Sequence, residues 1–233
     1  MTDLLDPGSQ SSTPETFVSD FSVPEGQLTF DAEGQETRGA YFSRKAHCPG
    51  GASGVTIGRG YDMRERTQES VVSDLIAAGV PRGDAELLAQ GAKLTGNEAA
   101  HFIARADVKV IQISPMAQKK LFSAVYGQYA ADVKRISSKS DTVAKYGNVD
   151  WENLDPAIKD VVVDLRYRGD YTPATRREIQ EIIAHNDLQG LYDVLSNQAK
   201  MTGEWGVPRD RFERRRDYLA AALKAHGNGE HVG

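Results

Sequence analysis

Cysteine is nearly absent from this sequence. Cys48 is the single cysteine among 233 residues, which excludes an intramolecular disulfide. No C-x-x-C pair or other His/Cys ligand spacing occurs, so we predict neither a metal site nor a cofactor. No run of 18 apolar residues occurs either, which excludes a transmembrane helix. A lone thiol is usually a packing residue, although Cys48 also qualifies as a nucleophile in principle.

Basic residues are outnumbered by acidic ones. There are 28 Lys and Arg against 33 Asp and Glu, which gives a net charge of −5. This balance argues against a nucleic-acid-binding surface. Apolar residues make up 39% of the chain, which is enough for a globular core. The first residues lack the basic and apolar regions of a secretory signal, so we expect synthesis in the cytoplasm.

The chain divides into three parts by composition. Residues 1–23 are rich in Ser, Thr, Gln, Gly and Pro around positions 8–15 and are predicted to form a flexible arm. Residues 24–225 are predicted to form one domain, and residues 226–233 a flexible tail.

Within the domain, the hydrophobic pattern changes near residue 60. Glycines interrupt short apolar segments over 27–61, which predicts strands joined by tight turns over 27–60. From Thr67 onward, apolar residues recur at helical spacing, with helix-start signals at Ser114-Pro115 and Asp155-Pro156. We therefore predict an α+β fold with a small glycine-rich β-hairpin lobe, a larger helical lobe and a cleft between them.

Two carboxylates flank the glycine-rich region, Glu33 on one side and Asp62 on the other. Cleavage of a glycosidic bond requires one acid to protonate the leaving oxygen and a second carboxylate to act on water or on the sugar. Thr56 lies between them and carries a hydroxyl that can hold a water. The simpler reading is that Glu33 is a solvated turn residue, Thr56 a strand residue and Asp62 a cap or turn residue.

The same segment resembles phage-type lysozymes. Those enzymes carry a Glu-Gly pair, an aromatic residue and a Thr-Ile-Gly-x-Gly run, which correspond here to Glu33-Gly34, Tyr41 and 56–60. The resemblance is closest to the toxin branch typified by the C-terminal domain of pesticin. It implies a lysozyme-like fold in which Glu33 is the general acid and Thr56 and Asp62 position the attacking water.

This sequence departs from the phage pattern at two positions. Phage lysozymes place the second acid before the Thr-Ile-Gly run, but no Asp or Glu occurs between Glu36 and Thr56. Asp62 is the nearby replacement, as in the pesticin-like branch. Tyr61 also stands where phage lysozymes usually have His. The motif covers about thirty residues, and the helical order downstream is compatible with the family but less specific.

Further residues are assigned to substrate binding. They are Gly58, Arg59 and Tyr61 in the glycine run, and Arg166 and Tyr167 after an apolar helix face. A helix-end structural role is the alternative for the last two. His47 and Trp205 are weaker candidates, for which core packing is the expected role. Arg211, Arg214, Arg215 and Arg216 are expected to form a solvated helix face.

The resemblance implies a muramidase that cleaves the β-1,4 bond between N-acetylmuramic acid and N-acetylglucosamine, with inversion. The alternatives are a lytic transglycosylase and a noncatalytic cell-wall-binding module. The implied partner is the glycan strand of peptidoglycan. Such a protein acts in the periplasm or cell wall, as a toxin effector exported to its target or as a phage endolysin. The toxin resemblance favours the effector, which implies a cognate immunity protein.

Overall fold

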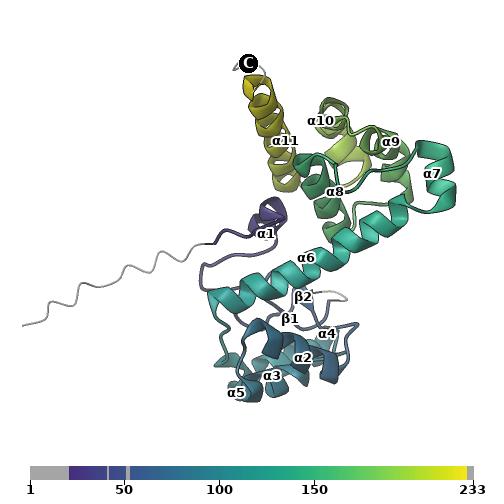
Figure 1. The fold of residues 1–233 in the computed structure, drawn as a ribbon. Coiled ribbons are helices and arrows are strands. Elements are labelled where there is room, and N and C mark those ends of the chain that lie inside the picture. The colour runs from purple at the N-terminus through teal and green to yellow at the C-terminus, as the bar shows by residue number, and fades with distance from the viewer. Residues whose placement is uncertain (1–20, 41, 51–52, 230–233) are drawn as a thin grey trace, which may run out of the picture.

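The computed structural model describes residues 21–40, 42–50 and 53–229. Over these residues the protein is a mostly helical domain with one small antiparallel hairpin (Figure 1). The twelve helices of this part of the chain are α1 (Gln27–Ala32), α2 (Gln68–Ala78), α3 (Arg82–Ala89), α4 (Gly96–Ala104), α5 (Ala106–Lys109), α6 (Pro115–Ser137), α7 (Ser140–Tyr146), α8 (Pro156–Arg168), α9 (Pro173–Ala184), α10 (Leu188–Leu195), the π-helix η1 (Ala199–Glu204) and α11 (Arg209–Gly229).

The hairpin consists of β1 (Thr56–Ile57) and β2 (Tyr61–Asp62). The strands pair antiparallel, with Thr56 opposite Asp62 and Ile57 opposite Tyr61. Residues 58–60 form the turn, in which Gly58 and Gly60 have φ values of 65° and 89°. These left-handed conformations explain why glycine occupies both positions.

The long helix α6 joins two groups of helices (Figure 1). Ser114 caps its start by accepting a hydrogen bond from the Ala117 amide at 3.0 Å, and Pro115 occupies the first turn. The N-terminal lobe contains the hairpin and α2–α5, and its core includes Ile57, Leu75, Leu88, Phe102 and Leu121. The C-terminal lobe contains α8–α11, and its core includes Ile158, Leu165, Ile179, Leu191 and Phe212.

A third, aromatic cluster lies where the two lobes meet. It is built from Phe30 of α1, Phe122 and Tyr126 of α6, and Val163 of α8. The rings of Phe30 and Phe122 meet edge to face, with centroids 5.0 Å apart. This cluster fixes α1, and with it Glu33 at the end of that helix, against α6 and α8.

The predicted helical domain with a small antiparallel hairpin is confirmed, but the sheet expected over residues 27–60 is wrong. Residues 27–32 form α1, which buries Leu28, Thr29 and Phe30 in succession. A six-residue helix is too short to be stable alone, so packing decides its conformation. Arg59 stabilises its end by donating hydrogen bonds to the carbonyls of Phe30 and Gly34.

The expected arm and tail fall only partly within the described residues. Residues 1–20, which include most of the expected arm, lie outside the described residues, as does Tyr41. Phe21 and Val23 are partly buried against the aromatic cluster. Helix α11 continues to Gly229, past the boundary expected at residue 225.

Candidate functional site

Glu33 lies directly after α1. Its amide donates to the Thr29 carbonyl at 2.9 Å, so the backbone at this position is fixed by the helix. Its carboxylate accepts a hydrogen bond from the Arg211 guanidinium of α11. The Glu33 side chain is 21% exposed. The structure therefore places a partly accessible carboxylate between α1 and α11 and holds it there by a charged hydrogen bond.

Arg211 belongs to a buried array of alternating charges. It donates to Asp164 of α8 at 2.6 Å, and Arg215 donates to the other oxygen of Asp164 at 2.7 Å. Arg215 also donates to Asp170 at 2.8 Å, and Asp170 in turn pairs with Arg168. Asp164 and Arg215 are fully buried. We call this set, together with Glu33, the buried charge array.

The array corrects the prediction that the basic stretch of α11 is a solvated face. Arg211 and Arg215 are buried, whereas Arg214 is exposed and Arg216 is partly exposed. Buried arginines require acidic partners because an unpaired charge is costly to desolvate. The helix therefore turns two of its five arginines inward to meet the acidic residues of α8 and of the loop that follows α8.

Thr56 and Asp62 are brought together by the hairpin. They are directly opposite each other, which places their Cβ atoms about 4.5–5.5 Å apart on one face. Thr56 is buried and its hydroxyl donates to the Gly54 carbonyl at 3.4 Å. Asp62 accepts from the Arg64 amide at 2.8 Å and pairs with the Arg64 guanidinium at 3.4 Å.

Tyr167 of α8 connects the hairpin turn to the neighbourhood of Glu33. Its hydroxyl donates to the Arg59 carbonyl at 2.8 Å, and its ring packs on Tyr129 with centroids 4.6 Å apart. Burial, and to a lesser degree the charge of nearby Glu33, raises the pKa of Tyr167 well above its ordinary value. The Tyr167 hydroxyl is therefore neutral and serves as a hydrogen-bond donor.

Gly60 is the point where the turn and Tyr167 touch. A Cβ at this position would lie 2.5 Å from the Tyr167 hydroxyl oxygen, and φ is already +89°. We expect Gly60→Ala to destabilise the protein by about 2 kcal/mol or more, because a left-handed alanine costs about 1–2 kcal/mol before any clash. Urea unfolding measures the loss.

Gly79→Ala is the matched control for this substitution. Gly79 has a φ of +95°, and a Cβ added there would meet nothing within 4 Å, so this variant reports the backbone cost alone. An equal loss of stability in the two variants would show that the contact with Tyr167 is unimportant.

A polar cavity of about 470 Å³ lies beside the hairpin. It brings together two predicted site residues, Asp62 and Arg166, and is also lined by Gly60 of the hairpin turn. Arg166 is oriented by Asp132 of α6 at 2.6 Å. The remaining lining residues are Arg64, Glu65, Arg66, Val125, Gln128, Tyr129 and Asp132. Glu33 and Thr56 are not among the residues that line this cavity.

The other three predicted binding residues face the protein interior. Gly58 lies near Leu121 and donates its amide to the Ser43 carbonyl at 2.7 Å. Arg59 is buried, with its guanidinium 3.9 Å from the Phe30 ring centroid. Tyr61 is 2% exposed and donates to Asp74 at 2.7 Å. The structure therefore uses the Gly58 amide and the Arg59 and Tyr61 side chains to hold the hairpin in place.

Glu36 has a structural position that the sequence reasoning missed. Its carboxylate accepts from Gln118 of α6 at 2.7 Å, from Arg44 at 2.9 Å and from Arg59 at 3.5 Å. These bonds tie the loop after Glu33 to α6 and to the hairpin turn. The sequence also did not predict the positions of Arg211, Asp164 and Tyr129 near the candidate site, because only the folded chain brings them there.

His47 flanks Thr56 and gives a pH-dependent prediction. Burial lowers the pKa of His47 from 6.5, against a smaller opposing effect of the Lys45 carbonyl. Below pH 6.5 the unfolded chain therefore binds the proton more readily, and stability falls as the pH falls towards the lowered pKa. We expect a smaller difference in unfolding free energy between pH 7.5 and pH 5.5 for His47→Gln than for the wild type. Urea unfolding at both pH values checks this, and equal differences would contradict it.

Cys48 and Trp205 are partly buried against the cores of the N-terminal and C-terminal lobes, respectively. In the described part of the chain, no group of three His, Cys, Asp or Glu residues is arranged to hold a metal ion. None of the helices described is long and apolar enough to cross a membrane.

A comparison with protein families shows which family the chain belongs to. A family described as "Domain of unknown function (DUF8812)" matches residues 26–216. The matched range includes Glu33, the hairpin and every arginine of the buried charge array. No curated protein matches the chain.

Proposed function

The chain belongs to the DUF8812 family, and we propose that it is a peptidoglycan hydrolase of the muramidase class with a lysozyme-like fold. The proposed reaction is hydrolysis of the β-1,4 bond between N-acetylmuramic acid and N-acetylglucosamine. The supporting architecture is a hairpin-bearing lobe and a helical lobe joined by α6 (Figure 1).

The observation that carries the proposal is the position of Glu33. It is fixed by α1 on the backbone side and by Arg211 on the side-chain side, yet it remains partly accessible. A general acid must be held at the scissile oxygen, and a carboxylate anchored through one oxygen keeps the other available. Glu33 is therefore the acid of this proposal.

Thr56 and Asp62 supply the second function that glycoside hydrolysis requires. Their direct opposition across the hairpin places a hydroxyl beside a carboxylate, and in this proposal the two hold one water between them. Asp62 also lines the polar cavity, where Gly60 and Arg166 are available to contact the sugar. In this mechanism Glu33, protonated on the oxygen that Arg211 does not hold, donates that proton to the leaving oxygen. Asp62 takes a proton from the water that attacks from the opposite face of the ring.

A water-using site of this kind inverts the anomeric centre. Inversion requires carboxyls about 6.5–9.5 Å apart, whereas direct attack by the second carboxylate requires about 5–5.5 Å. The Thr56–Asp62 pair favours inversion, because a hydroxyl beside the carboxylate helps to hold a water and contributes nothing to direct attack.

Product analysis tests the function and its alternatives together. We expect mass spectrometry of digested peptidoglycan to show reducing N-acetylmuramic acid ends, and NMR of the fresh products to show the α-anomer first. Anhydro-sugar ends would identify a lytic transglycosylase, which has no need for Thr56 and Asp62. Intact glycan together with retained wall binding would identify a noncatalytic module. An initial β-anomer would mean that the anomeric centre is retained, and this result would exclude the water-holding role proposed for Thr56.

The proposed site of action is the periplasm or cell wall. A toxin effector or a phage endolysin would both reach it after cytoplasmic synthesis. As an effector, the protein would require a cognate immunity protein in the producing cell, and its partner in the target would be the glycan strand. The proposed chemistry uses side chains of this chain and water, without a cofactor.

A further inference from the structure

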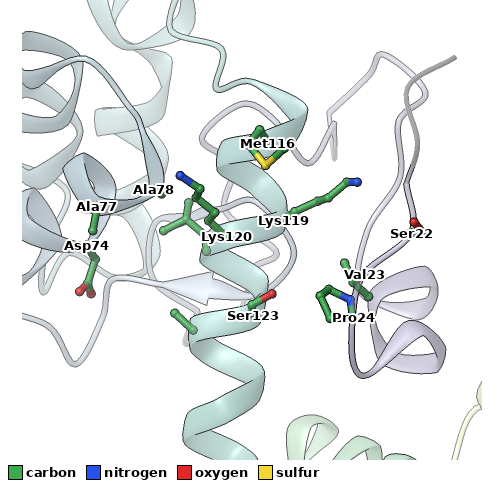
Figure 2. A pocket seen from close by; sticks show the side chains of 12 residues that line it. Ser22, Val23, Pro24, Asp74, Ala77, Ala78, Met116, Lys119, Lys120 and Ser123 are labelled. Carbon is green, nitrogen blue, oxygen red and sulfur yellow. The ribbon is translucent and has the colours of Figure 1, made fainter. Parts of the chain in front are cut away.

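A second hollow lies on α6, separate from the polar cavity. It has a volume of about 680 Å³, with α6 as its floor and with α2 and residues 22–24 as its walls (Figure 2). We call it the α6 groove. Its lining residues are Ser22, Val23, Pro24, Asp74, Ala77, Ala78, Met116, Lys119, Lys120, Leu121, Ser123 and Ala124. None of these residues lines the polar cavity.

The surface of the α6 groove is mainly apolar. Val23 and Pro24 form one wall, Ala77 and Ala78 the other, and Leu121 lies in the floor. Met116 is one of two large hydrophobic side chains exposed in the described residues, at 58% exposure. Exposed apolar surface gathered in a hollow usually marks a binding site.

The charge at the groove is positive. Lys120 is exposed and has no hydrogen bond or ion pair with any residue that the structure describes. Figure 2 shows Lys120 directed towards the α2 wall and Lys119 towards the wall of residues 22–24. Asp74, the acidic residue of the lining, already accepts from Tyr61 at 2.7 Å and from Arg66 at 3.2 Å. The groove therefore presents an uncompensated cation beside apolar surface.

The size of the groove restricts its occupant. The stretch of α6 from Met116 to Ala124 is about 12 Å long at 1.5 Å per residue. The volume of about 680 Å³ lies in the range of about 300–1,000 Å³ that is typical of small-molecule sites. A single alkyl chain along α6 fits both this volume and this length.

We propose that the α6 groove binds a free medium-chain fatty acid, with the alkyl chain along α6 and the carboxylate at Lys120.

The two walls of the α6 groove belong to different parts of the fold. The α2 wall is part of the N-terminal lobe, and Val23 donates its amide to Gln27 of α1 at 2.9 Å. A bound chain therefore connects the N-terminal lobe to the segment that leads into α1 and Glu33. The binding itself does not depend on the proposed muramidase activity.

Titration calorimetry of the full chain with dodecanoate, below its micelle concentration, tests this site. We expect saturable binding at one site and about five- to tenfold weaker binding for Lys120→Gln. Ala124→Trp should abolish binding, because Ala124 lies on the floor and its exposure allows the larger side chain without disturbing the core. Lys224→Gln and Ala131→Trp, both at exposed helical positions outside the groove, should bind as the wild type does.

Further measurements test the role of Lys120, the location of the binding site and the nature of the ligand. Dodecyltrimethylammonium that binds as tightly as dodecanoate would overturn the role of Lys120. Unchanged binding by Ala124→Trp would show that dodecanoate associates elsewhere. If the protein floats with anionic phospholipid vesicles but does not bind dodecanoate, its ligand is a membrane surface and the proposal is wrong.

Discussion

Glu33→Gln is expected to lower the rate of peptidoglycan cleavage by about two or more orders of magnitude, which is the loss typical of removing a general acid. The fold should be retained. Arg211 keeps its bond to Asp164 at 2.6 Å when the Glu33 charge is removed, and a glutamine of equal size still accepts a hydrogen bond. Initial rates on purified peptidoglycan, together with thermal unfolding, separate the loss of activity from a loss of structure.

Asp31→Asn is the matched control. Asp31 lies in α1, two residues before Glu33, is exposed and accepts a bond from Gln27 at 2.8 Å, so its charge is removed without changing a residue of the site. A fully active Glu33→Gln variant would exclude Glu33 as the acid. A noncatalytic wall-binding role would then account for the protein better.

Glu36→Gln is not a neutral control, although the position of Glu36 in the sequence, close to Glu33, suggests that it could serve as one. Glu36 holds Arg44, Arg59 and Gln118 together, so the substitution weakens the attachment of the hairpin turn to α6. Any loss of activity in this variant must therefore be compared with its loss of stability. If it were inactive at wild-type stability, the acid would be Glu36 instead of Glu33.

Local signals in the sequence predicted the helices well. Thr67 caps α2 and Gly79 ends it in the left-handed conformation, and Asp155 caps α8 ahead of Pro156, as the residue types indicate. These features depend on bonds within a few residues of each other. The pairing of Thr56 with Asp62 is also local, because a tight hairpin joins residues six positions apart.

The features that could not be predicted from the sequence depend on contacts between residues far apart in the chain. The sequence 27–32 alternates apolar and polar residues like a strand, but Arg59 and Phe122 fix it as a helix. The partner of Glu33 is 178 positions away on α11. The apparent surface arginines of α11 become buried ligands of Asp164 only when α8 packs beside them. No local pattern specifies these pairings.

Asp164→Asn is expected to destabilise the protein by about 3 kcal/mol, at the lower end of the range for breaking a buried ion pair. Asp164 is fully buried and binds Arg211 through one oxygen and Arg215 through the other. Asparagine keeps one acceptor but turns a donor towards the second arginine and removes the charge that both require. Equilibrium urea unfolding measures the loss, and Asp193→Asn at an exposed position of α10 should stay within about 0.5 kcal/mol of the wild type.

The same substitution should also lower activity through Glu33, because Arg211 loses the partner that fixes its position. This effect can be separated from instability. Well below the unfolding temperature, where the variant is fully folded, we expect a lower kcat with little change in KM, since the acid is misplaced while the sugar contacts remain. Replacing Asp164, Arg211 and Arg215 together by apolar residues of similar size should recover much of the stability and none of the activity. A triple variant with wild-type activity would show that the buried charge array has no role in positioning Glu33.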